Sequence, residues 1–177
     1  TTRDLYDQTV KDFRGLTPDQ IKERMESLKG DLSSMDKATP DAFLGGLNKE
    51  IGAKGKIVEG KDNNLEFKSY SLSGEEMDRI LPENATPEQR KAVEKAMSEY
   101  LRSVDRWSGR EGDAVRASNQ LMRSLKDAGL DTPDKMKPAL DAVNQRASEN
   151  GADRNARLEI NDKGTWFLMR GSGDNRR

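Results

Sequence analysis

The chain has 177 residues, and its 31 basic and 32 acidic side chains nearly cancel, which gives a formal net charge of −1 at pH 7. It contains neither cysteine nor histidine, so disulfides, Cys/His zinc sites and Ser-His-Asp triads are excluded. The charge balance disfavours nucleic acid as a partner, because nucleic-acid-binding proteins usually carry a basic stripe. No apolar run is long enough for a membrane span or a signal peptide, so we expect a soluble protein, either cytoplasmic or secreted.

Four triplets of Thr-Pro followed by Asp or Glu predict helix starts along the chain. In each triplet the threonine hydroxyl can accept a free backbone N–H, proline suits the first helical position, and the carboxylate lies near the positive end of the helix dipole. Gln20 and Gln89 add a reciprocal hydrogen bond at two of these starts. The triplets begin at Thr17, Thr39, Thr86 and Thr132.

The N-terminal third is predicted to form three helical segments. Residues 3–14, 18–35 and 41–51 carry apolar side chains at helical spacing. The third segment contains Gly45 and Gly46, and two adjacent glycines cost a helix about 2 kcal/mol relative to alanines. We therefore expect either a break at this point or a close contact with another helix.

Two segments show the alternating pattern of β-strands and predict hairpins, at about residues 56–72 and 157–169. The first is followed by a short helix, which Ser73 and Glu76 start as a capping box. Gly164 suits the left-handed position that closes the turn of the second hairpin. Because a two-stranded hairpin alone is marginal in water, we expect the two hairpins to pair into one small four-stranded antiparallel sheet.

Three consecutive helices are predicted between the hairpins, over residues 87–105, 113–128 and 132–147. Their short connections favour an antiparallel helical layer. The expected buried stripes consist of Ala92, Val93, Ala96, Met97, Tyr100, Leu101, Val104, Val115, Ser118, Leu121, Met122, Leu125, Met136, Leu140, Val143 and Ala147. The fold class is therefore α+β, mostly α, with six to seven helices in a single domain over residues 1–170 and a mobile tail at 171–177.

The connection between the first two of these helices carries Trp107 and Glu111, four positions apart. This Trp-x-x-x-Glu spacing resembles the motif of a class of bacterial secreted effectors that act on host small GTPases. The resemblance covers these two residues and implies a protein partner, although the central Ser-Gly departs from the helical setting that those effectors use. The alternative interpretation is an interhelix loop whose tryptophan packs against the core.

Arginines gather around the same connection. Tryptophan and arginine dominate binding hot spots, which favours a partner-binding surface here. This surface is expected to consist of Trp107, Glu111, Arg102, Arg106, Arg110, Arg116 and Arg123. If the arginines bind phosphate instead, the chain is a nucleic-acid-associated protein that uses region 102–126. Because acidic residues lie among them, a solvated face with ion pairs within each helix is the simplest alternative.

Three further features carry alternative functions. Glu66 and Glu159 lie on the two predicted hairpins and would face each other in a shared sheet, as a carboxylate pair suited to glycoside hydrolysis or transfer. The Asp and Asn clusters at 62–64 and 161–164 lack the spacing of a calcium loop and are explained by turns, so we expect no metal. In the apolar run 166–169, strand alternation directs two side chains away from the core, toward covering helices or a partner.

The missing catalytic side chains, the balanced charge and the lack of any cofactor signature favour a non-enzymatic protein–protein interaction domain with no cofactor. The accompanying hypothesis is a bacterial or phage origin, as a secreted virulence effector or an accessory factor. A nucleic-acid-associated protein is the second interpretation, and a carboxylate-based enzyme is the third. The sequence does not determine an oligomeric state.

Overall fold

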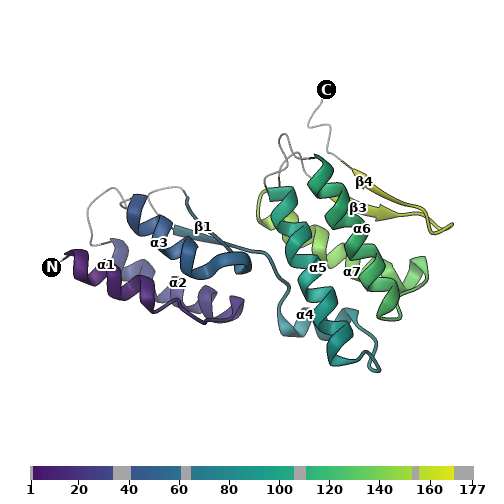
Figure 1. Ribbon diagram of the computed structural model, residues 1–177, viewed down its shortest axis with the longest axis horizontal. Coiled ribbons are helices and arrows are strands. Elements are labelled where there is room, and N and C mark those ends of the chain that lie inside the picture. Colours follow the sequence, from purple (N-terminus) through teal and green to yellow (C-terminus); the bar gives the residue numbers. More distant parts are fainter. Residues whose placement is uncertain (1, 34–40, 61–64, 106–110, 153–155, 170–177) are drawn as a thin grey trace. The chain divides into compact units, whose positions relative to one another are not determined.

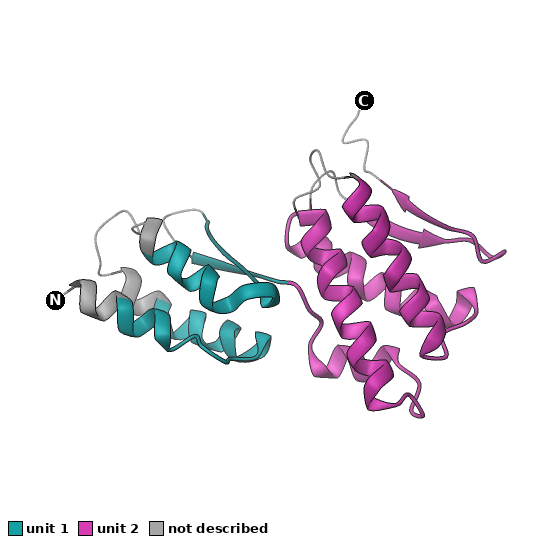
Figure 2. Ribbon diagram, viewed as in Figure 1, with its two compact units in different colours: residues 1–69 teal, residues 70–177 magenta. Residues whose placement is uncertain are grey.

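The computed structural model describes residues 2–33, 41–60, 65–105, 111–152 and 156–169. Over these residues the fold is α+β and mostly α, as expected, with seven α-helices and two small antiparallel sheets (Figure 1). The chain divides into two compact units, residues 1–69 and 70–177, and each has its own hydrophobic core (Figure 2). The single domain expected over residues 1–170 stays a prediction, and the expected tail at 171–177 lies outside the described residues.

Unit 1 consists of three helices followed by a hairpin. Its elements are α1 (Thr2–Lys11), α2 (Pro18–Ser33), α3 (Asp41–Ile51), the 3₁₀ helix η1 (Gly52–Lys54), β1 (Gly55–Glu59) and β2 (Leu65–Ser69). Its core includes Phe13, Leu47 and Ile57, all fully buried. α3 runs through its two glycines without interruption, and a Cβ added at Gly46 would lie 3.3 Å from the Cγ2 of Val10 in α1. The expected close contact between helices is therefore confirmed.

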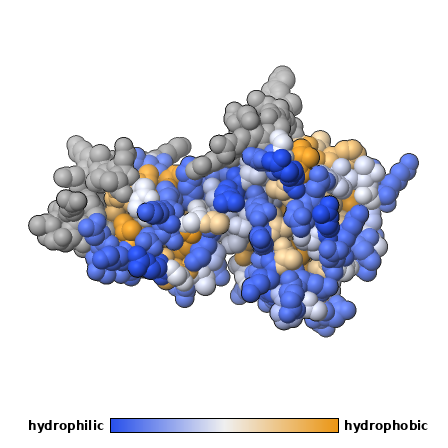
Figure 3. Space-filling view, viewed as in Figure 1, coloured by the Kyte–Doolittle hydropathy of each residue, from blue (hydrophilic) through white to orange (hydrophobic). Residues whose placement is uncertain are grey.

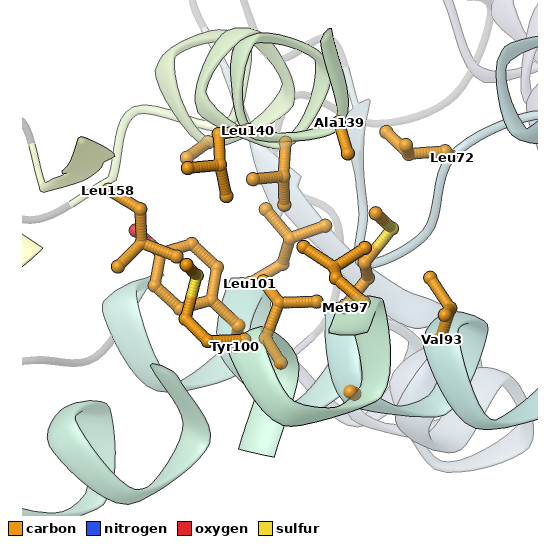
Figure 4. Close-up of a cluster of buried hydrophobic side chains, with 14 of the residues drawn as sticks. Leu72, Val93, Met97, Tyr100, Leu101, Ala139, Leu140 and Leu158 are labelled. Atoms are coloured by element: carbon orange, nitrogen blue, oxygen red, sulfur yellow. The ribbon is translucent and has the colours of Figure 1, made fainter. Parts of the chain in front are cut away.

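Unit 2 has the same succession of three helices and a hairpin, preceded by a short helix. Its elements are α4 (Gly74–Ile80), α5 (Pro87–Asp105), α6 (Glu111–Asp127), α7 (Pro133–Glu149), β3 (Arg157–Ile160) and β4 (Trp166–Met169). α5 packs along α6 and against α7. Figure 4 shows Met97 and Leu101 of α5 facing Leu140 of α7, with Leu72 on one side and Leu158 of β3 on the other.

The helix starts lie where the threonine triplets predict them. Thr17 and Thr86 accept hydrogen bonds from the backbone N–H groups of Gln20 and Gln89, at 3.2 and 3.1 Å, and the glutamine side chains accept the threonine N–H groups at 2.9 and 2.8 Å. Thr132 caps α7 in the same way, without the reciprocal bond. The short helix α4 begins with the expected capping box. The triplet at residue 39 begins outside the described residues.

Two residues of the expected buried stripes are exposed. Val115 is 45% exposed and Ala92 is also exposed, so both predictions are wrong. Ala114 and Ala117, which the expected stripe omits, are buried instead. Positions 114 and 115 both continue the helical spacing toward Leu121, so periodicity alone does not choose between them. The packing of α6 along α5 makes that choice.

The two hairpins form separate two-stranded sheets over the described residues, so the predicted four-stranded sheet is wrong. Ile57 of β1 lies opposite Phe67 of β2, and Leu158 of β3 lies opposite Leu168 of β4. Each hairpin packs on the last long helix of its own unit, β1 on α3 and β3 on α7. Because these helices already bury the apolar face of each hairpin, neither hairpin needs the other to complete its core.

The same side-chain contact anchors the first strand of both hairpins. Asn48 of α3 donates its Nδ2 to the carbonyl of Ile57 at 2.9 Å and accepts the Ile57 N–H at 2.6 Å. Asn144 of α7 makes the same pair of hydrogen bonds to Leu158, both at 2.8 Å. Each asparagine therefore takes the place of a neighbouring strand at one position and satisfies the outward-facing backbone groups of Ile57 or Leu158.

Candidate functional site

An open cleft of about 610 Å³ lies between α5 and α6, the two helices that the sequence connects through Trp107. Its described lining residues are Glu99, Arg102, Ser103, Asp113, Arg116, Ala117 and Gln120. They come from the C-terminal part of α5 and the N-terminal half of α6. The helix pair that builds the core of unit 2 therefore also positions the side chains of this cleft.

The structure describes the side chains of three predicted site residues, and all three are exposed. Arg102 and Arg116 are brought together as lining residues of the cleft, one from each helix. Arg123 lies two turns beyond Arg116 on α6 and is not among the described lining residues. Glu111 begins α6, but its side chain is outside the described part of the chain. Also outside the described residues are Arg106, Trp107 and Arg110.

Acidic groups accompany both cleft arginines. The guanidinium of Arg116 forms an ion pair with the carboxylate of Asp113 one turn earlier on α6, and Glu99 lies one turn before Arg102 on α5. The paired side chains are 77% and 48% exposed, so their ion pair contributes less than about 1 kcal/mol and is easily exchanged for another partner. The cleft therefore presents both signs of charge, in keeping with the mostly hydrophilic surface visible in Figure 3.

The carboxylates considered for catalysis are separated by the sheet topology. Glu66 lies opposite Val58 in one hairpin, and Glu159 lies opposite Phe167 in the other, so the shared sheet that would make them neighbours is not formed. Glu159 is instead held by Arg157, with 2.6 Å between Nε and Oε2. Within the described residues, no cluster of three or more acidic side chains is arranged to hold a metal ion.

The C-terminal hairpin has one covered face and one open face. Trp166 and Leu168 are partly buried and pack on the core of unit 2. Phe167 and Met169 are 48% and 38% exposed on the opposite face. The alternation expected for residues 166–169 is therefore confirmed, and among the described residues helices cover one of the two faces.

Arg146 makes a largely buried contact within unit 2 that the sequence does not single out. Its Nη2 lies 2.7 Å from Oε1 of Glu76, and its Nη1 donates to the carbonyl of Ser71. Burial raises the pKa of the Glu76 carboxyl, but the hydrogen bond from the Ser73 backbone N–H and the charge of Arg146 outweigh burial, so this pKa lies below its ordinary value. The contact ties α7 to the capping box of α4 and has a structural role.

Tyr100 carries another polar group whose setting the sequence does not reveal. Its side chain is fully buried, and its hydroxyl has no hydrogen-bond partner among the described residues. Burial raises the pKa of this phenol well above its ordinary value, so it stays protonated. Because the sequence places Tyr100 on an apolar stripe, it predicts the burial of the ring but gives no sign of the unpaired hydroxyl.

Among the described helices, none combines the length and the apolar character needed to cross a membrane. No family model matches the chain, and neither a curated protein nor a solved structure shows significant similarity to it.

Proposed function

We propose that the protein is a non-enzymatic protein-binding domain whose contact surface is centred on the cleft between α5 and α6. The observation that supports this proposal is the mixture of charges in the cleft, where Arg102 and Arg116 lie among Glu99 and Asp113. Arginines gathered without acidic neighbours favour a phosphate-binding surface, because each carboxylate repels the phosphate. Charges of both signs suit a protein surface that carries the complementary pattern.

We propose that the connection between the two helices is also part of this contact surface. Trp107, Arg106 and Arg110 lie in it, and Glu111 follows at the start of α6. Tryptophan and arginine supply most of the energy of typical hot spots, and the cleft arginines would flank them. The resemblance of Trp107 and Glu111 to the secreted-effector motif extends the proposal to a bacterial effector that acts on a host protein.

The test is capture of a partner on the full chain, from host-cell and bacterial lysates, with and without nuclease, followed by affinity measurement with the identified protein. Arg102→Ala and Arg116→Ala are each expected to weaken binding by about tenfold or more. Arg79→Ala is the matched control, because Arg79 is an exposed arginine of α4 that does not line the cleft. Equal effects of all three substitutions, or capture that nuclease abolishes, would contradict the proposal.

Trp107→Ala separates recognition from packing. If Trp107 is a recognition residue, Trp107→Ala is expected to weaken partner binding by about 2 kcal/mol or more and to change the melting temperature by a few degrees at most. Glu111→Ala is expected to share this phenotype. If Trp107 instead packs against the core, Trp107→Ala is expected to lower the free energy of unfolding by about 3–5 kcal/mol, and Glu111→Ala is expected to change neither binding nor stability.

A further inference from the structure

The outer edge of β3 is bound at Leu158 by a side chain of α7, whereas that of β4 has no such contact among the described residues. The N–H of Asn161 donates to the carbonyl of Thr165 at 2.9 Å, so hydrogen-bonded pairs alternate from there along the hairpin, and the Leu158–Leu168 pair is not hydrogen-bonded. Leu158 therefore directs its N–H and carbonyl to the outer edge of β3, where Asn144 binds both. By the same alternation, Trp166 and Leu168 direct theirs to the outer edge of β4, where no backbone group of the described residues meets them.

Apart from its short length of four residues, the open edge has no feature that discourages another strand. Natural edge strands are usually protected by a charged residue, a proline or a bulge, and residues 165–169 contain none of these. This absence of charge stands out in a chain in which 36% of residues are charged. The exposed face beside the edge presents Phe167 and Met169, and its two charges, Arg157 and Glu159, neutralise each other.

We propose that β4 pairs antiparallel with β4 of a second copy of this chain. In the register that places Phe167 opposite Phe167 of the second copy, Trp166 lies opposite Leu168 and Leu168 opposite Trp166. The open N–H and carbonyl groups then form four hydrogen bonds, and the two phenylalanines occupy the closely spaced position between them. The product is a four-stranded sheet, which is more stable than two isolated hairpins.

Charge and closure favour a second copy as the occupant. Strand β4 has no charged residue, so pairing between two copies brings no like charges together. For the same reason, β4 has no charge with which to select a charged strand of another protein. The two-fold arrangement is self-complementary. Because Asn144 already occupies the Leu158 position on the outer edge of β3, that edge is less available to a further strand than the edge of β4. This inference uses β4 and does not depend on the proposed cleft function.

Sedimentation equilibrium of the full chain tests the pairing. A contact as small as one four-residue edge is weak, so we expect monomer at about 10 μM and a rising dimer fraction toward several hundred μM. Phe167→Lys and Phe167→Glu are each expected to abolish the dimer, because like charges then lie opposite each other. An equimolar mixture of the two variants is expected to restore it. Val115→Lys, which changes another exposed apolar residue, is the control and is expected to dimerise like the wild type.

A wild-type chain that stays monomeric over this range overturns the inference, as does loss of the dimer in Val115→Lys. Failure of the mixture to restore the dimer overturns the register. Amide hydrogen exchange of the wild type gives a measurement that needs no variant. The amides of Trp166 and Leu168 are expected to become more protected as the protein concentration rises, and unchanged exchange at both positions contradicts the pairing.

Discussion

Asn144→Ala tests how the C-terminal hairpin is attached to its helices. The asparagine side chain holds the N–H and the carbonyl of Leu158 at 2.8 Å each, and Leu158 is 1% exposed. Removing the amide leaves two backbone groups without their partner at a buried position. The substitution changes no apolar packing of comparable size, so its effect reports mainly on these two hydrogen bonds.

The expected loss follows from the cost of each group. A buried donor or acceptor left unsatisfied costs about 1–3 kcal/mol, so the pair costs about 2–6 kcal/mol. Alanine returns about 0.6 kcal/mol through its higher helix propensity. Water that reaches the outer edge of β3 satisfies part of the lost bonding and favours the lower half of this range. We therefore expect Asn144→Ala to lower the free energy of unfolding by about 1.5–3.5 kcal/mol.

Urea titration followed by tryptophan fluorescence measures this loss, because both tryptophans lie in unit 2 and Trp166 is part of the hairpin. Gln145→Ala is the matched control, since Gln145 is the exposed neighbour of Asn144 on α7, and its effect is expected to stay within about 0.5 kcal/mol. Asn48→Ala should act on unit 1 in the same way, as followed by circular dichroism. A loss for Asn144→Ala no larger than that of Gln145→Ala would refute the reasoning.

Three further predictions follow from the core and the helix starts. Tyr100→Phe removes a buried hydroxyl that has no hydrogen-bond partner among the described residues. In urea titration this change is expected to leave the free energy of unfolding unchanged or to raise it by up to about 1 kcal/mol. A clear loss of stability would mean that the hydroxyl does form a hydrogen bond. The pKa of Glu76 in the folded protein lies below its ordinary 4.5, so the stability that its carboxylate contributes is present above that pH and is lost as the pH falls through the folded-state pKa. The stability advantage of the wild type over Glu76→Gln should therefore shrink on acidification. A constant difference from pH 6 to pH 3 in urea titrations would contradict this. Thr86→Ala removes the cap of α5 and should cost about 1 kcal/mol in chemical denaturation; unchanged stability would contradict a stabilising role of this cap.

Only part of the candidate site was accessible from the sequence. The arginines at 102 and 116 could be proposed because they flank a tryptophan, and the structure brings them into one cleft. The acidic residues near these arginines were visible in the sequence, but the cleft itself depends on the spacing between α5 and α6. Arg123, which the sequence grouped with them, lies further along the helix and is not among the described lining residues. A count of arginines carries no information about which helix faces meet.

The sequence by itself determined the helix starts and the strand segments, because capping, proline placement and alternation are local and act within a few residues. It placed α5 at its observed bounds and predicted both faces of β4. Tertiary structure alone decided that Ala114 is buried and Val115 exposed, that each hairpin stays in its own unit, and that an asparagine binds the first strand of each hairpin. These outcomes depend on contacts between residues distant in the chain, where several arrangements satisfy the same local pattern and packing selects one of them.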